Sequence, residues 1–160
     1  RLLVEHGNEV LTDGQLVSNW IATELEPFPL DNADMIHLVK VYFEWQAAGK
    51  MPNNKTLQYH EDPKIQELVM GLFEPEHELS QRWNEKLGIK KIVVDVSFHQ
   101  DVEVSLLYYK LRKIKKMIRQ NQEDMEKVQG EEQIQLLHIH KHLKDAEREL
   151  TKIIGTVIFK

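Results

Sequence analysis

Two heptad patterns in the last sixty residues constrain the fold more than any other feature of this chain. From about Gln100 onward, apolar residues recur in steps of three and four, the spacing that aligns side chains along one face of a coiled-coil helix. The first seam consists of Val104, Leu107, Leu111, Ile114, Ile118, Asn121, Met125 and Val128. After Gly130 and the acidic pair Glu131 and Glu132, which suit a helix N-terminus, a second seam follows. It consists of Leu136, Ile139, Leu143, Ala146, Leu150, Ile153 and Val157.

Two seams on either side of one glycine predict an antiparallel helical hairpin. Pairing the seams from the turn outward keeps their layers in step over arms of roughly 40 Å. Asn121 is the only polar member of its seam, and in this register it faces Ile139 and His140. Because a buried Asn in a coiled coil costs stability but fixes the register, we expect Asn121 and His140 to form a polar layer.

The residues before the hairpin predict a bundle of short helices. Glycine, proline and capping residues divide this part into amphipathic segments too short to be stable alone, so they must share a core. We expect a first helix that ends at Gly7, with Gly7 in the left-handed conformation. Further helices are expected over 15–26, over 30–49, from Asp62-Pro63 onward, and over 77–88. Asp31 or Asn32 is the expected cap of the helix over 30–49. The stretch 89–96 is β-branched and without a helical period, which indicates an extended connector or a short strand. The expected fold is therefore all-α, a bundle of short helices (1–96) followed by a long antiparallel helical hairpin (97–160).

The inward faces of these helices follow from the same spacing. On 15–26 the pattern predicts Leu16, Trp20, Ile21 and Leu25. On 30–49 it predicts Met35, Ile36, Val39, Tyr42 and Phe43. For the helix that starts at Pro63 it predicts Ile65, Leu68, Val69 and Leu72, and on 77–88 it predicts Leu79, Trp83 and Leu87.

Composition excludes several classes of protein. With 41% hydrophobic and 29% charged residues the chain is typical of a soluble globular protein, and no apolar run is long enough for a membrane helix. The absence of Cys rules out disulfides and thiolate zinc sites and suits the cytoplasm. The chain opens at Arg1 without an initiator Met, as we expect of a piece of a longer protein. It has no Gly-rich phosphate loop, nucleophile elbow or zinc-protease motif, so we expect neither catalytic residues nor a cofactor.

Three closely spaced histidines, His138, His140 and His142, raise the possibility of a metal site or a pH switch. His138 and His142 are four residues apart and could together chelate an ion. A dedicated zinc site needs three or four ligands, and no thiolate or carboxylate completes this set. We therefore interpret the cluster as hairpin surface and expect no metal.

The segment KLRKIKKMIR, residues 110–119, holds six basic residues in ten and could bind phosphates. A helical nucleic-acid-binding adaptor is therefore an alternative function. In the expected register, however, Arg112, Lys113 and Lys116 lie near Glu149, Arg148 and Asp145. The net charge is −5 and the run contains no aromatic stacking partner. We expect direct nucleic-acid contact to be weak or absent.

Several segments resemble a known family both in their amino-acid sequence and in their order along the chain. They are RLLVEHGNEVLT, WIATELE, YHEDPKIQELVMGLF with HELSQRW after it, and YYKLRKIKKMIR before the hairpin. Together they are similar to the C-terminal, helicase-binding domain of bacterial DNA primase, especially its Bacteroides-type versions. The resemblance implies a bundle plus a hairpin that docks on the N-terminal domains of the hexameric replicative helicase. The zinc-binding domain and polymerase core of that family are absent from this chain, so the fragment would make no primers, although its parent would.

Candidate partner-binding residues are apolar or aromatic positions outside the seams, together with charged neighbours. They are Tyr108, Tyr109, Leu137, Ile154, Ile158 and Phe159, with Lys144, Arg148 and Lys152 beside them. The terminal stretch IIGTVIFK is apolar on more than one face, so we place part of the docking surface there. The alternative is that some of these side chains pack the hairpin onto the bundle.

Overall fold

The computed structural model describes residues 1–74 and 98–158, with side chains described up to Gly155. This part of the chain is helical and contains no strand, which confirms the predicted all-α class. The chain divides into two compact units, Arg1–Phe98 and His99–Lys160. None of the described helices is long and apolar enough to span a bilayer. The helix expected over 77–88, with Trp83, and the connector expected over 89–96 lie outside the described residues.

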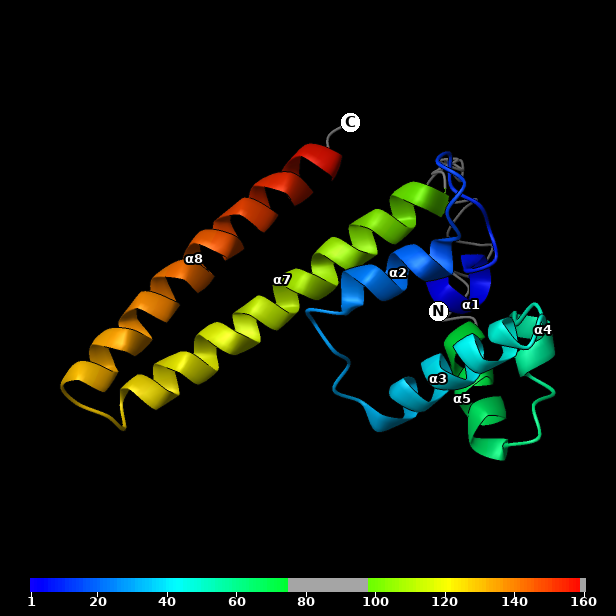
Figure 1. The fold of residues 1–160 in the computed structure, drawn as a ribbon, viewed down its shortest axis with the longest axis horizontal. Coiled ribbons are helices and arrows are strands. Elements are labelled where there is room, and N and C mark those ends of the chain that lie inside the picture. Colours follow the sequence, from blue (N-terminus) through cyan, green and yellow to red (C-terminus); the bar gives the residue numbers. More distant parts are fainter. Residues whose placement is uncertain (75–97, 159–160) are drawn as a thin grey trace, which may run out of the picture. The chain divides into compact units, whose positions relative to one another are not determined.

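The described part of the first unit consists of short helices: α1 (Leu2–His6), α2 (Val17–Leu25), α3 (Ala33–Ala47), α4 (Asn54–Leu57) and α5 (Pro63–Phe73) (Figure 1). Local capping explains where three of them begin. The Asn32 side chain accepts hydrogen bonds from the backbone N–H groups of Asp34 and Met35, and the Asp62 carboxylate accepts one from Lys64. Asn53 and Thr56 form a reciprocal capping box on α4. Asn32, rather than Asp31, is thus the cap of α3.

The core of the first unit draws on all five of these helices. Its buried apolar side chains are Leu3, Val4, Val17, Ile21, Leu38, Val41, Tyr42, Leu57, Ile65 and Val69. On α5 the predicted inward face is correct at Ile65 and Val69, while Leu68 and Leu72 are only partly buried. Ser18 of α2 and Gln46 of α3 exchange two hydrogen bonds. The Gln46 side-chain amide donates one of 2.9 Å to the Ser18 hydroxyl, and that hydroxyl donates one of 3.3 Å to Gln46 Oε1.

The predicted inward faces of α2 and α3 need correction. α3 buries Leu38, Val41 and Tyr42, whereas Ile36 is exposed. α2 buries Val17, Ser18 and Ile21, while Leu16, Trp20 and Leu25 are partly exposed. Both helices are apolar around much of their circumference, so periodicity alone does not select one stripe.

Gly7 also departs from the prediction. It has a right-handed conformation, φ −60° and ψ −25°, rather than the left-handed one expected of a glycine cap. A β-carbon at this position would clash with the Tyr42 hydroxyl and the Leu3 carbonyl oxygen. Glycine is therefore required here for space. The glycines that do adopt positive φ among the described residues are Gly14, Gly49 and Gly130.

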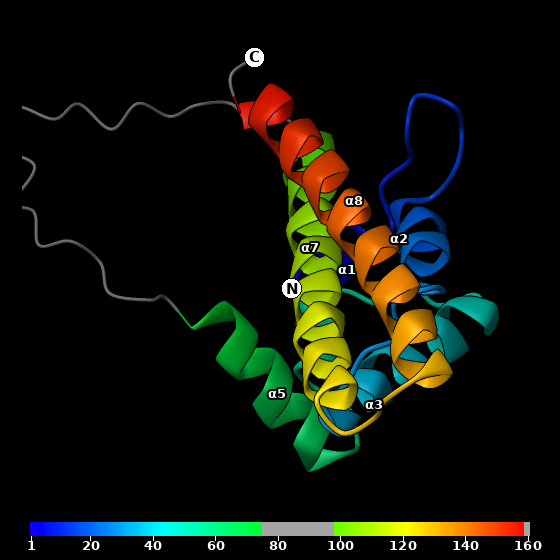
Figure 2. The same cartoon turned by 90° about the vertical axis from the view of Figure 1, so that its left-hand side faces the viewer.

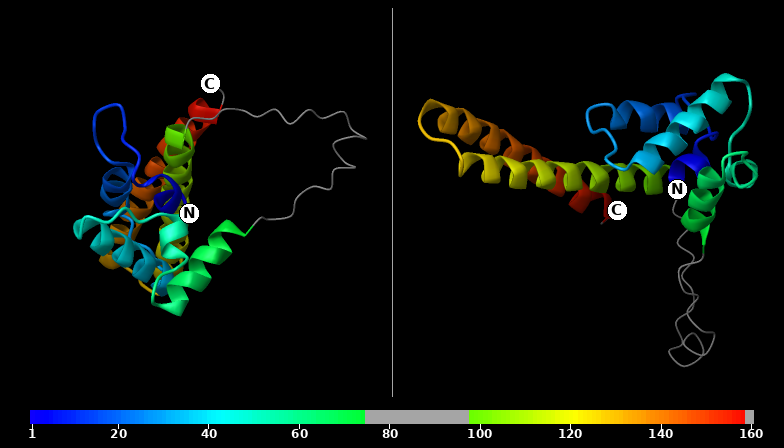
Figure 3. Two further views of the ribbon diagram at one scale, coloured as in Figure 1. Left: turned by 90° about the vertical axis from the view of Figure 1, so that its right-hand side faces the viewer. Right: turned by 90° about the horizontal axis from the view of Figure 1, so that it is seen from below.

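The second unit is the predicted hairpin. Its two helices, each of 28 residues, are α7 (Phe98–Met125) and α8 (Glu131–Ile158). Phe98, the first residue of α7, still belongs to the first unit. Figure 2 and both views of Figure 3 show the two helices running antiparallel, side by side. Gly130 has φ +74°, and its carbonyl oxygen accepts the backbone N–H of Ile134 at 3.2 Å. This glycine thus turns the chain and starts α8, as the interruption between the seams predicts.

Candidate interaction surface of the helical hairpin

The inward side of α7 agrees with the predicted seam. Leu111, Ile114, Ile118 and Asn121 are buried, and Met125 at the end of the helix is partly buried. Val102 and Leu106 are also buried, although both lie outside the seam. The two positions predicted nearest the start of α7, Val104 and Leu107, are only partly buried.

On α8 the predicted seam is correct in part and shifted at two positions. Ile139 and Ile153 were predicted to face inward, yet they are 49% and 44% exposed. Their neighbours His140 and Ile154 are the more buried residues instead, with Ile154 only 7% exposed. The apolar surface of α8 is wider than one seam, so two adjacent stripes compete for the interface. A strict heptad also drifts by about 20° per repeat relative to a straight helix.

Asn121 and His140 are the residues expected to form a polar layer. Asn121 Oδ1 and His140 Nδ1 are the buried side-chain polar atoms without a hydrogen-bond partner among the described residues. No direct hydrogen bond joins them there. Buried polar atoms left unpaired cost free energy. The polar layer of Asn121 and His140 remains a prediction.

The predicted partner-binding residues fall into three groups. Tyr108 and Leu137 are 48% and 59% exposed, so both are accessible to a partner. Tyr109 is only partly exposed. Ile154 is buried, so it does not belong to an exposed docking surface. The prediction for Ile154 was wrong because the heptad spacing placed Ile153, rather than Ile154, on the inward face. The side chains of Ile158 and Phe159 lie outside the described part of the chain.

The charged neighbours on α8 make ion pairs mainly within their own helix. Lys144 Nζ lies 3.0 Å from Glu147 Oε2, and Arg148 Nη1 lies 3.4 Å from Asp145 Oδ1. Lys152 is exposed and makes no ion pair within the described residues. The Arg148–Asp145 pair is exposed, and such pairs contribute little to stability.

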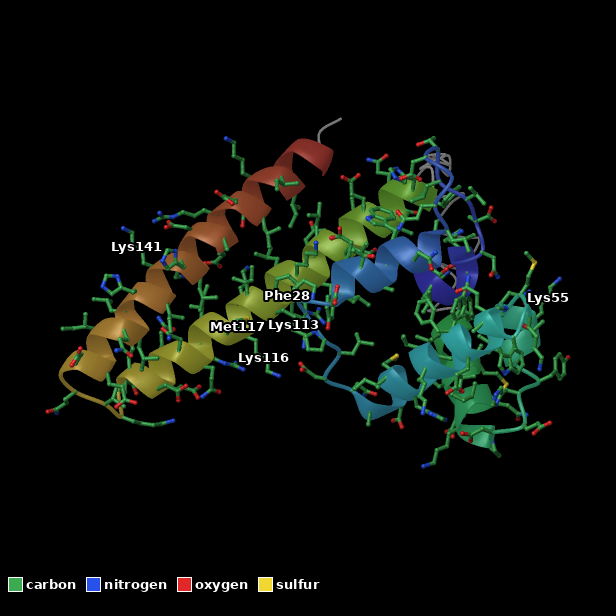
Figure 4. All side chains as sticks on the ribbon, in the orientation of Figure 1. Phe28, Lys55, Lys113, Lys116, Met117 and Lys141 are labelled. Carbon is green, nitrogen blue, oxygen red and sulfur yellow. The ribbon has the colours of Figure 1, made fainter. Side chains whose placement is uncertain are left out.

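Arg112, in the basic segment of α7, lacks the cross-hairpin partner that the register suggested. Arg112 was expected to meet acids across the hairpin, but it makes no ion pair or hydrogen bond with any described residue. Asp145, one of the expected acids, pairs with Arg148 on its own helix. Lys113 Nζ lies 5.7 Å from the centre of the Tyr109 ring. Figure 4 shows Lys113, Lys116 and Met117 extending from the middle of α7.

The histidine cluster brings no metal ligands together. His138 and His142 are exposed and His140 is partly buried. In the described ranges no three His, Asp or Glu side chains are arranged to hold a metal ion. Outside the hairpin, His37 Nε2 lies 2.9 Å from Asp62 Oδ2, and the hydrogen bond from His37 lowers the pKa of Asp62. This pair ties α3 to the start of α5.

The first unit also contains an apolar cavity of about 360 Å³ between α2, the following loop and α3. Ile21, Leu25, Ile36 and Phe43 line it, and Glu26 is its one charged lining residue. Ile36 and Phe43, predicted to be core residues, thus line a hollow instead. Burial raises the pKa of Tyr42, in the adjacent core, to about 12.

Comparison with known proteins gives a family without an assigned activity. No curated protein and no solved structure matches the chain. A family model, described as a domain of unknown function (DUF8430), matches residues 1–157. Since the match covers nearly the whole chain, this protein belongs to the DUF8430 family.

Proposed function

We propose that this chain is a protein-docking module, the helicase-interaction domain of a bacterial DNA primase. In this role it brings primase to the replicative helicase during primer synthesis in the cytoplasm. The module itself carries no catalytic residues or cofactor; primer synthesis belongs to other domains of the parent chain. The resemblance of its segments to the helicase-binding domain of primase supports the assignment, and so does the succession of a short-helix unit and a long hairpin.

One observation carries the docking role: the hairpin leaves large apolar side chains exposed. Ile134, Leu137, Ile139 and Ile153 on α8 are each more than two-fifths exposed, as is Tyr108 on α7. Single exposed apolar residues are common on protein surfaces, but several along one helix indicate contact with a partner. Helical faces with apolar anchors are a frequent means of engaging a partner groove. The N-terminal domains of the hexameric helicase are the proposed partner.

Size-exclusion chromatography with light scattering tests the proposal. The chain is run alone and mixed with the replicative helicase of its host at low micromolar concentration. We expect co-elution. A folded, helical chain that fails to co-elute would contradict the docking role.

Matched substitutions locate the surface. Leu137→Asp places a charge on an exposed apolar position of α8 and should weaken co-elution. Ile158→Asp/Phe159→Asp tests the terminal stretch in the same assay. Met51→Asp is the control, because Met51 is 71% exposed but lies in the first unit. If the control weakens binding as much as Leu137→Asp does, the hairpin is not the docking surface.

A further inference from the structure

A stripe of four residues on α7 combines positive charge with an aromatic ring. Tyr108, Arg112, Lys115 and Arg119 follow one another in steps of four, three and four residues, so they share one face of the helix. All four are exposed, and the Tyr108 ring is 48% exposed. We call this set the α7 basic stripe.

The cations of the α7 basic stripe are not neutralised. Arg112, Lys115 and Arg119 make no ion pair or hydrogen bond within the described part of the chain. No acidic residue occurs in α7 between Glu103 and Glu123. On α8, by contrast, Lys144 and Arg148 each have a carboxylate within 4 Å. An acidic chain with net charge −5 therefore keeps a local positive surface on this face.

The surface beside the stripe is hollowed. An open depression of about 580 Å³ is lined by Ser105, Tyr108, Tyr109, Leu111, Arg112 and Lys115. The sequence alone suggested that the basic run lacks a stacking partner, because Tyr108 precedes residues 110–119. On the helix, however, Tyr108 lies one turn from Arg112, on the same face.

We propose that the α7 basic stripe binds single-stranded nucleic acid. Arg112, Lys115 and Arg119 contact the phosphodiester backbone, and an unpaired base stacks on Tyr108. Sequence-tolerant single-strand binding depends on this combination of cations tracking the backbone and an aromatic platform for bases. An acidic helix from a protein partner fits less well, since helix-in-groove binding needs apolar anchors and the stripe supplies none apart from Tyr108. This inference does not require helicase docking, although the two proposed surfaces share Tyr108.

Fluorescence anisotropy on the full chain tests the proposal. The probe is a fluorescein-labelled oligothymidylate of about 20 nucleotides, longer than a site of roughly 4–16. Binding is measured against salt, because the slope of log K with log salt is about −0.7 per phosphate contact for a single strand. The variant Arg112→Gln/Lys115→Gln/Arg119→Gln should flatten that slope by about 2 and weaken binding about a hundredfold near 0.1 M salt.

A second triple variant is the matched control. Lys55→Gln/Lys64→Gln/Lys141→Gln removes the same charge from exposed positions on α4, α5 and α8. Figure 4 shows Lys55 and Lys141 extending outward from their helices. We expect this control to keep nearly the wild-type slope. If the two triple variants lose affinity equally, binding is a general charge effect and the stripe is not the site.

Substitutions at Tyr108 test the stacking contact separately. Tyr108→Ala should weaken binding about fivefold or more, whereas Tyr108→Phe keeps the ring and should keep the affinity. Tyr59→Ala, at an 85% exposed tyrosine of the first unit, should have no effect. Circular dichroism confirms that each variant remains helical.

Three further outcomes would overturn the proposal. The first is no binding of the oligonucleotide to the wild-type chain at low salt. The second is equal affinity for a duplex of the same length. The third is tighter binding of a poly-glutamate peptide than of the oligonucleotide, which would assign the stripe to an acidic protein segment. Each can occur whether or not the chain co-elutes with helicase, so this test and the docking test fail independently.

Discussion

Gly7 lies so close to Tyr42 that a β-carbon at position 7 would be 2.8 Å from Cζ of the Tyr42 ring. The backbone carbonyl of Leu3 closes the other side, so the added methyl group has no space. We predict that Gly7→Ala lowers the free energy of unfolding by about 1–3 kcal/mol, as overpacking does. Urea unfolding followed by circular dichroism measures this.

Gly71→Ala is the control for that experiment. Gly71 lies within α5, and a β-carbon there would meet no atom within 4 Å. The same substitution should therefore stabilise the protein by about 0.5–1 kcal/mol through helix propensity. Equal effects of the two substitutions would show that the Gly7–Tyr42 contact is not tight in solution.

The buried Tyr42 hydroxyl predicts a loss of stability at alkaline pH. It donates a 3.3 Å hydrogen bond to Asn8 Oδ1, and burial raises its pKa from 10.0 to about 12. The folded state therefore holds this proton more tightly than the unfolded state does. Its contribution is complete below pH 10 and is lost as the pH rises toward 12, on the order of 2 kcal/mol.

Comparison with Tyr42→Phe isolates that contribution. At neutral pH the free energy of unfolding of the phenylalanine variant should be about 1 kcal/mol lower, because the variant lacks the hydrogen bond to Asn8. The variant has no hydroxyl to ionise at alkaline pH. Unfolding free energies at about pH 9 and about pH 11 should fall more steeply for the wild type than for the variant. Tyr59→Phe, at an exposed site, should follow the wild type. Parallel pH profiles for all three proteins would contradict the prediction.

The features that the sequence predicts well are those with a local physical cause. Asp62 before Pro63 marks the start of α5, and Gly130 separates α7 from α8, because caps and left-handed turns depend on a few adjacent residues. The helical hairpin also follows from heptad spacing. The short helix α4, by contrast, was not predicted, although the capping pair of Asn53 and Thr56 marks its start in the sequence.

Which face of a helix is buried was predicted less well. Ile139 and Ile153 are exposed and Ile154 is buried, because α8 is apolar on more than one stripe. The choice between stripes depends on packing with another helix, which periodicity cannot specify. Arg112 has no ion pair within the described residues for a related reason. Its cross-hairpin neighbours were inferred from the register, but Asp145, one of the expected acids, pairs with Arg148 within α8.

The Asp62 carboxylate predicts a second pH effect, at the acidic end. Hydrogen bonds from His37 and then from the Lys64 backbone hold its pKa below the usual 3.8. Its stabilising effect is therefore complete above pH 3.8 and is lost as the pH falls through the lower, folded-state pKa. Asp62→Asn keeps an oxygen to cap α5 but loses the charge opposite His37.

Thermal unfolding of the wild type and Asp62→Asn measures this effect. The wild type should have the higher Tm near pH 6, and the difference should shrink as the pH drops below 3.8. Glu67→Gln, on the exposed side of α5, is the control and should show no such pattern. A difference that stays constant down to pH 2 would mean that the His37–Asp62 pair does not form.

Asn121 offers the sharpest test of how the hairpin is specified. Its Oδ1 atom is buried without a partner, and so is Nδ1 of His140. Because an unpaired buried polar atom costs about 1–3 kcal/mol, Asn121→Leu should raise the free energy of unfolding by about 1 kcal/mol. Gln122→Leu, one residue away and exposed, should change it by less than about 0.5 kcal/mol.

If Asn121 also fixes the register, light scattering should show dimers of Asn121→Leu that the wild type lacks. A clear loss of stability in Asn121→Leu would mean instead that Asn121 is hydrogen-bonded in solution, as the predicted layer with His140 requires.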